Sequence, residues 1–328
     1  MRIEDVAVPS NWNDLLDRAP DGTPSHRCEF LDLTAEYSDT RLHPYVGYRG
    51  KEPVGLFPVF ELRKGPFASA FSPPPDLKIP YLGPLLLPPD NMKRRKREQR
   101  NRRFVSAVLG RVDRDVGPRF LNVRTSPAYG DERPFLWNGC EGTIRHTYVV
   151  DLTRDEEDML AALGQDARRN VSTDVSYEVA EGDVADVDPI LDAVEDRYAS
   201  QGIDFSLSHS FVTDLFHRLP DGAIRAYVCR QEETFLGGDV VLECGDTIYG
   251  WLGAVDLDAD LPVSDFLYWH VFMDAKRRGR TSYDMVGAND CRLSSYKAKF
   301  GPTLRSYATV QQTTLDGQLA STLYRAIF

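Results

Sequence analysis

Residues 281–301 read TSYDMVGANDCRLSSYKAKFG, a stretch that joins a short apolar strand, a glycine turn and a lysine set among aromatic residues. The strand pattern runs over residues 281–286 and holds Asp284 between two large side chains. A carboxylate inside a strand is costly unless it is hydrogen-bonded. Asp284 is therefore interpreted either as a general base or as the acid that holds the following turn, which contains Asn289.

The segments before this stretch predict a helix and three strands. Ser264 is a suitable N-cap for a helix that closes with the basic residues 276–278 and Gly279. Strand patterns cover residues 225–230, 235–243 and 247–253. Helical spacing recurs further upstream, where Thr153 with Glu156 predicts a capping box. Helices, then antiparallel strands, then a helix and further strands indicate an α+β fold with a mixed sheet.

An internal repeat relates the two halves of the chain. At an offset of 182 residues, Tyr45 aligns with Tyr227 and Glu61 with Glu243, and each copy predicts a strand, a polar turn and a second strand. The same hairpin in both halves indicates a duplicated domain. We place the boundary near residues 137–146, which divides the chain into residues 1–140 and 141–328.

The motifs of the second half are specific enough to carry a resemblance. The chain resembles the FemABX and BioF2-like branch of the GNAT acyltransferase superfamily, most strongly over residues 225–302. The matching positions are Gly279, Asp284, Gly287, Leu293, Tyr296, Lys297, Phe300 and Gly301, with residues 167–170 and 247–254 upstream and residues 80–84 in the first half.

The resemblance implies tandem GNAT-like domains, each a mixed central sheet flanked by helices, with a degenerate first domain. It implies transfer of an acyl or aminoacyl group from an activated donor to an amine, with both substrates bound in a cleft between the halves. The donor would be aminoacyl-tRNA or acyl-CoA, with no tightly bound cofactor, and the acceptor a small molecule or an envelope precursor. Two alternatives stay open, an acyl-CoA-dependent N-acyltransferase and a catalytically silent binding module of the same fold.

Lys297 carries the most specific role that the resemblance implies. As a compact cation it would stabilise the oxyanion of a tetrahedral intermediate or a departing phosphate-bearing group, and the alternative is a surface lysine at the start of a strand. Backbone N–H groups around Gly253 and Ala254 are expected to polarise the substrate carbonyl. Other positions are expected to contact substrate, each with a structural alternative such as core packing or a favourable charge at a helix end. These positions are Tyr81, Arg168, Arg169, Asn170, Tyr249, Trp251, Asn289 and Tyr296.

Charge composition constrains partners and habitat. The 328 residues carry a formal net charge of −11, which argues against a general nucleic-acid binder. Asp outnumbers Glu by 34 to 16 and Arg outnumbers Lys by 31 to 8. This bias is typical of halophilic proteins, so we expect a high-salt cytoplasm.

One basic run interrupts the acidic chain. Residues 93–103, from Lys93 to Arg103, hold eight basic side chains. As a helix this run would be basic almost all round, so it is interpreted as an insertion in the first half rather than a core-facing element. It is either solvated or a contact for tRNA or anionic lipid head groups, and high salt would weaken such a contact.

Several absences complete the expectations. The loop at residues 256–265 carries four aspartates where CoA-dependent relatives bind pyrophosphate, which argues for another donor. The five scattered cysteines form no C-x-x-C pair and the six histidines form no metal motif, so no metal site is expected. With no signal peptide and no transmembrane segment, we expect a cytoplasmic protein.

Overall fold

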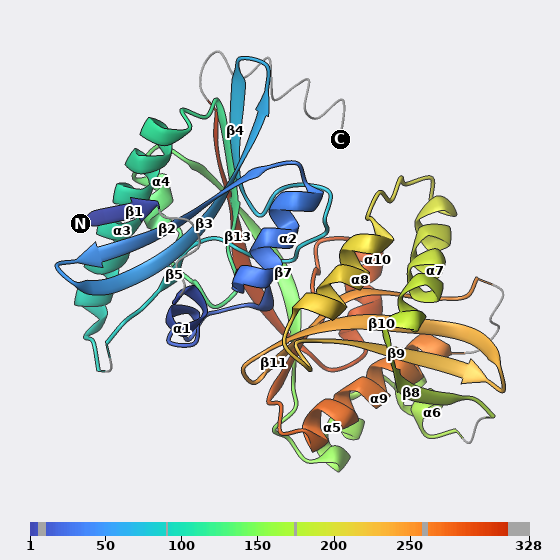
Figure 1. Ribbon diagram of the computed structural model, residues 1–328. Helices are drawn as coiled ribbons and strands as arrows, with labels where there is room; N and C mark the ends of the chain where they lie inside the picture. The colour runs from blue at the N-terminus through green and yellow to red at the C-terminus, as the bar shows by residue number, and fades with distance from the viewer. Residues whose placement is uncertain (6–10, 90, 174–175, 258–261, 314–328) are drawn as a thin grey trace. The chain divides into compact units, whose positions relative to one another are not determined.

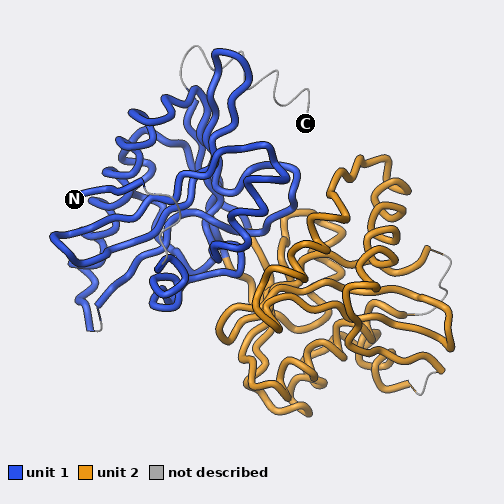
Figure 2. The backbone as a smooth tube through the Cα atoms, viewed as in Figure 1, with its two compact units in different colours: residues 1–145, 306–328 blue, residues 146–305 orange. Residues whose placement is uncertain are grey.

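The computed structural model describes residues 1–5, 11–89, 91–173, 176–257 and 262–313. The chain divides into two compact units, unit 1 formed by residues 1–145 and 306–328, and unit 2 formed by residues 146–305 (Figure 2). The chain passes between the units within two strands, β7 (Glu141–Asp151) and β13 (Thr303–Thr313). Over the described residues, no helix combines the length and apolar character needed to cross a membrane.

Unit 1 contains a mixed sheet in the order β1-β2-β3-β4-β6-β13 (Figure 1). Only β4 and β6 pair in parallel among these strands. The strands other than β13 are β1 (Arg2–Asp5), β2 (Arg41–Arg49), β3 (Glu52–Lys64), β4 (Phe67–Ser72) and β6 (Phe120–Arg124), with β5 (Leu85–Leu86) paired to β3. The helices are α1 (Trp12–Leu16), α2 (Cys28–Tyr37), α3 (Arg94–Asp115), α4 (Arg133–Leu136) and the 3₁₀ turn η1 (Pro24–His26).

Unit 2 contains the strand order β7-β12-β11-β10-β9-β8, in which only β11 and β12 are parallel. The strands other than β7 are β8 (Glu178–Gly182), β9 (Ile224–Gln231), β10 (Thr234–Cys244), β11 (Thr247–Val255) and β12 (Ser282–Asp284). The helices are α5 (Glu156–Ala162), α6 (Gln165–Val171), α7 (Val187–Ala199), α8 (His209–Arg218), α9 (Val263–Arg277) and α10 (Cys291–Ala298), with η2 (Val184–Asp186) before α7. The expected α+β class with mixed sheets flanked by helices is confirmed.

Two helices cover opposite faces of the unit 2 sheet. Val241 of β10 packs with α9 in the main apolar core of the unit. On the other face of the sheet, Ile190 of α7 lies against Gly238 of β10, where a side chain at position 238 would point away from α9. Alternate side chains of β10 therefore point into the two layers, as a central strand requires.

The repeat extends to the hydrogen-bonding register. The predicted hairpins are β2–β3 and β9–β10, and His43 pairs with Val59 as Arg225 pairs with Val241, 182 residues later. Both ladders also contain a bulge at the same repeat position, because pairing skips Val54 in one copy and Leu236 in the other. A shared bulge is a more specific sign of duplication than matched residue types.

A polar anchor ties each hairpin to the core helix of its unit. In unit 2, the Tyr227 hydroxyl donates to Asp274 Oδ2 over 2.7 Å, and Arg278 pairs with the same carboxylate at 2.8 Å. In unit 1, the Tyr45 hydroxyl donates to Asp115 Oδ2 over 3.2 Å, and Arg111 pairs with it at 2.6 Å. The aligned tyrosines therefore reach an Asp–Arg pair, at the C-terminal end of α9 in unit 2, where Arg278 is the residue after the helix, and on α3 in unit 1.

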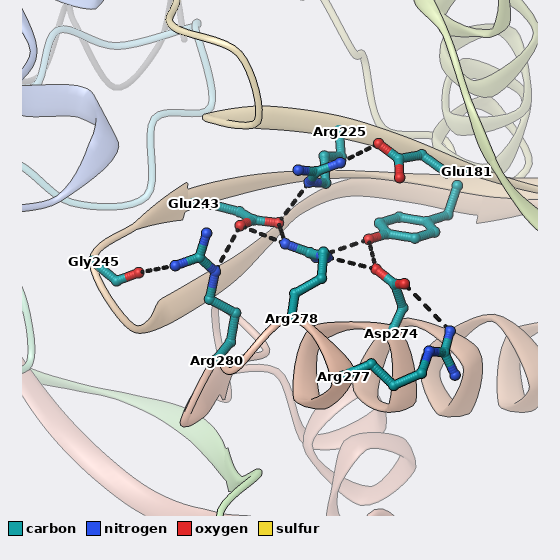
Figure 3. Close-up of polar contacts among 9 residues, drawn as sticks. Glu181, Arg225, Glu243, Gly245, Asp274, Arg277, Arg278 and Arg280 are labelled. Carbon is teal, nitrogen blue, oxygen red and sulfur yellow. Dashed lines mark hydrogen bonds and ion pairs between the residues drawn. The ribbon is translucent and has the colours of Figure 1, made fainter.

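Unit 2 extends this anchor into a larger network. Arg225, Arg278 and Arg280 converge on the buried carboxylate of Glu243 (Figure 3). Glu243 aligns with Glu61, which pairs with His43 and Arg63 in unit 1. Each of these arginines pairs with an acidic side chain. The network therefore has a structural role and is not an open site for an anion.

Three local expectations are wrong. α5 begins at Glu156 after Asp155, and Thr153 hydrogen-bonds Asp151 instead of capping the helix. α9 begins at Val263, one residue before the predicted cap. The basic run is the start of the 22-residue helix α3, whose later turns bury Phe104, Val105, Val108 and Val112, and so it is part of a core helix and not an insertion.

Candidate functional site

Two parallel strands of unit 2 diverge and leave an open strand edge. β12 pairs with β11 only over Thr247–Tyr249, whereas β11 continues to Val255. A bulge at Trp251 interrupts the β10–β11 ladder just after the paired stretch. Beyond this bulge, the edge of β11 that faces away from β10 is not paired with β12 in the described part of the chain.

The register of β10 and β11 fixes which backbone groups face this edge. The Asp256 N–H donates to the Leu236 carbonyl across the ladder over 2.9 Å. Antiparallel ladders alternate hydrogen-bonded and non-hydrogen-bonded pairs, so the N–H groups of Val255 and Gly253 point away from β10. Gly253 is exposed, and its N–H can therefore donate to a ligand carbonyl. The same alternation turns the Ala254 N–H toward β10.

The carboxylate of Asp239 lies directly beside Gly253. These residues are paired across β10 and β11, and a Cβ atom at Gly253 would overlap Asp239 Oδ1. A side chain at position 253 would therefore displace this carboxylate from its place against β11. Burial raises the pKa of Asp239 to about 7, against the opposing effect of the Lys297 charge. No described residue donates a hydrogen bond to Asp239, so the carboxylate is poised to exchange a proton near neutrality.

The charge of Asp239 raises the pKa of two buried tyrosine hydroxyls, Tyr268 and Tyr283, further than burial alone does. The Tyr283 hydroxyl of β12 is buried without a hydrogen-bond partner among the described residues. It lies under β11, where a Cβ atom at Gly250 would be 2.5 Å away. The Tyr268 hydroxyl of α9 has a pKa raised mainly by burial and further by the charge of Asp239. The rings of Tyr268 and Tyr283 are in edge-to-face contact, with centroids 6.2 Å apart.

Lys297 lies close to this group but is buried, with 7% of its surface exposed. Its Nζ donates to the carbonyls of Met285, Val286 and Gly287 at 2.7, 2.6 and 3.1 Å. Burial lowers the pKa of Lys297 to about 8, although Asp284 and Asp239 raise it. The alternative of a surface lysine at a strand start is wrong, because Lys297 is buried and belongs to α10. Its three protons are taken by backbone carbonyls.

Asp284 holds the same turn from the opposite side. Its Oδ1 accepts from the Val286 N–H at 2.8 Å and from Thr147 Oγ1 at 2.5 Å, and that hydroxyl in turn accepts from the Gly287 N–H. Val286 has φ of +46°, a strained value for a β-branched residue. Lys297 and Asp284 together therefore fix an unusual turn that leads out of β12.

The other predicted residues of unit 2 make structural contacts. Arg168 donates to the carbonyls of Ala161 and Leu163, at 2.6 and 3.0 Å, and Arg169 is exposed with Asp166 at 4.0 Å. Asn289 donates to the carbonyl of His146 and accepts from its N–H. The Trp251 ring packs edge-to-face on Phe211, whereas Tyr249 is half-buried on β11.

Asn170 and Tyr296 meet at Asp265, near the start of α9. They donate to its two carboxylate oxygens at 2.8 and 3.1 Å, and Lys299 pairs with it at 2.5 Å. Asp265 is buried and compensated within the fold. It therefore cannot repel a pyrophosphate as the acidic loop was expected to do. Asp258 and Asp260 of that loop lie outside the described residues.

Tyr81 belongs to unit 1. Its ring packs edge-to-face against Tyr307 with centroids 5.0 Å apart, and the side chain is buried. A hollow lined by residues such as Asp151, Arg154 and Trp269 contains none of the predicted site residues.

Sequence reasoning missed Asp239, Tyr268 and Tyr283. A signal was present in Gly237-Gly238-Asp239, since two glycines and an acid inside a strand pattern mark a place where the backbone is approached closely. The backbone N–H groups around Gly253 and Ala254 were expected to polarise the substrate carbonyl, and the register shows that only the Gly253 N–H points away from β10.

Comparison with known proteins identifies the type of domain. Residues 158–298 match the family described as Acetyltransferase (GNAT) domain. Three similar solved structures are FemX, L-PGS from Bacillus licheniformis, and a tandem GNAT protein from the clavulanic acid biosynthesis pathway. Their sequence identities are 10%, 14% and 13%, and their TM-scores 0.71, 0.54 and 0.53. The matches cover 94%, 95% and 95% of this chain, and 97%, 95% and 98% of the other chains. At these identities the likeness establishes the fold. No curated protein matches the sequence.

Proposed function

We propose that unit 2 acylates an amine at the open edge of β11, because residues 158–298 match an acetyltransferase (GNAT) domain and the chain shares the fold of FemX and of a tandem GNAT protein. The donor is an activated ester or thioester. The observation that carries the proposal is the pairing of Asp239 with Gly253, which sets a carboxylate of raised pKa beside an outward N–H.

The reaction follows from these two groups. The acceptor arrives as an ammonium ion and gives one proton to Asp239. The free amine attacks the acyl carbon, a C–N bond forms, and the carbonyl oxygen gains charge that the Gly253 N–H stabilises. The intermediate then collapses, the bond to the leaving oxygen or sulfur breaks, and the second amine proton neutralises the leaving group.

Lys297 and Asp284 act as positioning residues in this proposal. Their hydrogen bonds hold the turn after β12, and that turn follows Tyr283. Direct stabilisation of the oxyanion by Lys297 would require it to release a backbone carbonyl. The oxyanion role that the resemblance implies for Lys297 therefore passes to the backbone of β11.

Two donors remain compatible with the site. Aminoacyl-tRNA is supported by the exposed basic residues Arg94–Arg97, near which Glu98 pairs with Arg94 and Arg133. Acyl-CoA is the second candidate. Lys299 neutralises Asp265, so one of the four aspartates in the loop at residues 256–265 no longer argues against binding of a pyrophosphate there. A silent binding module gives no reason for an unbonded buried carboxylate beside an open N–H.

The proposal predicts a specific pH profile. In the native protein kcat/KM should rise as the pH passes through about 7, because Asp239 accepts a proton only when it is ionised. Asp239→Asn should lower kcat/KM by about 10²–10⁴-fold and abolish the rise of kcat/KM with pH. Acetyl-CoA and mixed aminoacyl-tRNA are assayed in parallel against a panel of amines, so the active donor is identified in the same experiment.

Asp246→Asn, which neutralises an exposed acid at the β10–β11 turn, is the matched control and should retain full activity. Asp239→Asn should also fold normally, since it replaces a carboxylate that burial already disfavours. A well-folded Asp239→Asn protein with the native pH profile would exclude Asp239 as the base.

A further inference from the structure

A buried histidine of unit 1 lies between two carboxylates. The side chain of His43 on β2 is 3% exposed, and its Nδ1 lies 2.9 Å from Asp5 Oδ2 on β1. Its Nε2 lies 2.9 Å from Glu61 Oε2 on β3. A neutral imidazole carries one N–H, so it can donate to only one of these two carboxylates. The second contact therefore requires a further positive ion, either a proton or a metal.

The internal repeat shows that a positive charge belongs at this position. In unit 2 the counterpart of His43 is Arg225, which pairs with Glu181 of β8 and with Glu243 of β10. Those two acids hold the same register positions in unit 2 as the two acids around His43 hold in unit 1. The side chain of Arg225 supplies a fixed charge, whereas the corresponding place in unit 1 must acquire one.

A third side chain, at the end of α3, reaches the same place. One ligand atom each from Asp5, His43 and Asp115 lie within 4.8 Å of one another. Ligands at about 2.0–2.1 Å from a tetrahedral zinc ion are about 3.3 Å apart, so modest side-chain rotations would bring these three atoms onto one ion. Tyr45 and Arg111 both bond to Asp115 Oδ2. Asp115 Oδ1 accepts no hydrogen bond from the described residues and is available to a metal ion.

We propose that His43 Nδ1, Asp5 and Asp115 bind one divalent metal ion of the zinc class in unit 1. One imidazole and two carboxylates are ligands that suit zinc, with water in the fourth position. Glu61 then accepts from the Nε2–H of His43, and such a carboxylate fixes the tautomer and orientation of a metal-bound histidine. The ion joins β1, β2 and the end of α3. This site does not depend on the function proposed for unit 2.

The expectation of no metal site rested on closely spaced ligands in the sequence. The three ligands here come from separate segments, and only the fold brings them together. A search for short motifs would place neither Asp5 nor Asp115 beside His43.

The test uses Zn²⁺ and Co²⁺ as probes on the full chain after treatment with a chelator. Calorimetry at neutral pH should show saturable binding of one Zn²⁺ per chain, and Co²⁺ should give the visible absorption of a tetrahedral site. His43→Arg copies the residue of unit 2 and should lose this binding. Without metal it should unfold at the same temperature as the native protein or higher, because it supplies a fixed charge between the two carboxylates.

Further variants separate the ligands from their surroundings. Glu61→Gln should weaken zinc binding by about 10–100-fold, because it changes only the group that holds the ring. If His43→Arg fails to fold, Asp115→Asn removes a ligand at the exposed end of α3 and should weaken binding by about tenfold or more. His209→Gln is the matched control, because His209 also lies between two carboxylates but is more exposed. It should keep the tightest binding event unchanged.

The proposal is overturned if the native protein binds no zinc saturably, if His43→Arg keeps the binding event, or if His209→Gln loses it. A thermal midpoint that responds to pH but not to zinc would assign the missing charge to a proton, and would also overturn the metal site. Asp239→Asn should bind zinc normally. A failure of the acyl-transfer proposal would therefore not be confused with a failure of this one.

Discussion

Buried polar residues decide how the unit 2 site is built. Lys297 was predictable as a special position through the resemblance, because the aromatic-Lys motif falls on Tyr296 and Lys297. Its role was not predictable, since the carbonyls that it binds are exposed by the left-handed backbone of Val286 and Gly287. A pattern of residue types does not report such a turn.

Replacing Lys297 tests its positioning role. Lys297→Met should lower the free energy of unfolding by about 2–4 kcal/mol, because three buried carbonyls lose their donor. Chemical denaturation measures this change. Lys276→Met is the control, since Lys276 donates to two carbonyls from a more exposed position, and it should cost less than about 1 kcal/mol. Equal losses in the two variants would show that Lys297 contributes no more than an ordinary surface lysine.

Asp239 was not predicted from the sequence as a site residue, although it is also an acid inside a strand pattern. An acid in a strand pattern is visible in the sequence, and Asp284 was selected on that ground. Asp284 is buried and accepts hydrogen bonds from the Val286 N–H and Thr147, whereas Asp239 is half-buried and accepts none from the described residues. The distinction depends on contacts between strands that are far apart in the chain.

At the level of elements, the duplicated hairpin was the most predictable feature. The offset of 182 residues located β2–β3 and β9–β10, and the same offset also relates their bulges. Helix starts were predicted less well, because Thr153 and Ser264 fit capping patterns while neighbouring residues begin the helices. The basic start of α3 was misread, since its core face lies at residues 104–112, beyond the run itself.

The matched tyrosine anchors predict parallel effects in the two units. Tyr227→Phe removes hydrogen bonds with Asp274 and Arg278 and should lower the free energy of unfolding by roughly 1–3 kcal/mol. Tyr45→Phe removes one longer bond to Asp115 and should cost about 1 kcal/mol.

Urea unfolding of both variants provides the measurement. Tyr48→Phe is the control, because the Tyr48 hydroxyl makes no hydrogen bond to any described residue, and its stability should not change. The equivalence of the anchors would be refuted if Tyr227→Phe were as stable as this control.

For the whole molecule, charge is the dominant property. A net charge of −11 produces self-repulsion in the folded state, and salt screens it. Raising KCl from about 0.1 to about 2 M should therefore increase the unfolding midpoint by several degrees, as expected of a high-salt protein. Thermal scans in KCl are compared with scans in sucrose of equal osmolality, which does not screen charge. A midpoint that falls with KCl would argue against the proposed habitat.

The path of the chain also has a consequence for its biosynthesis. Unit 1 receives strand β13, which pairs with β6 over Thr309–Thr313, only after the whole of unit 2 has been traversed. On the ribosome, all of unit 2 emerges before the last strand of unit 1 exists. The sheet of unit 1 therefore stays incomplete while unit 2 can already fold. Unit 1 begins to be synthesised first but is completed last.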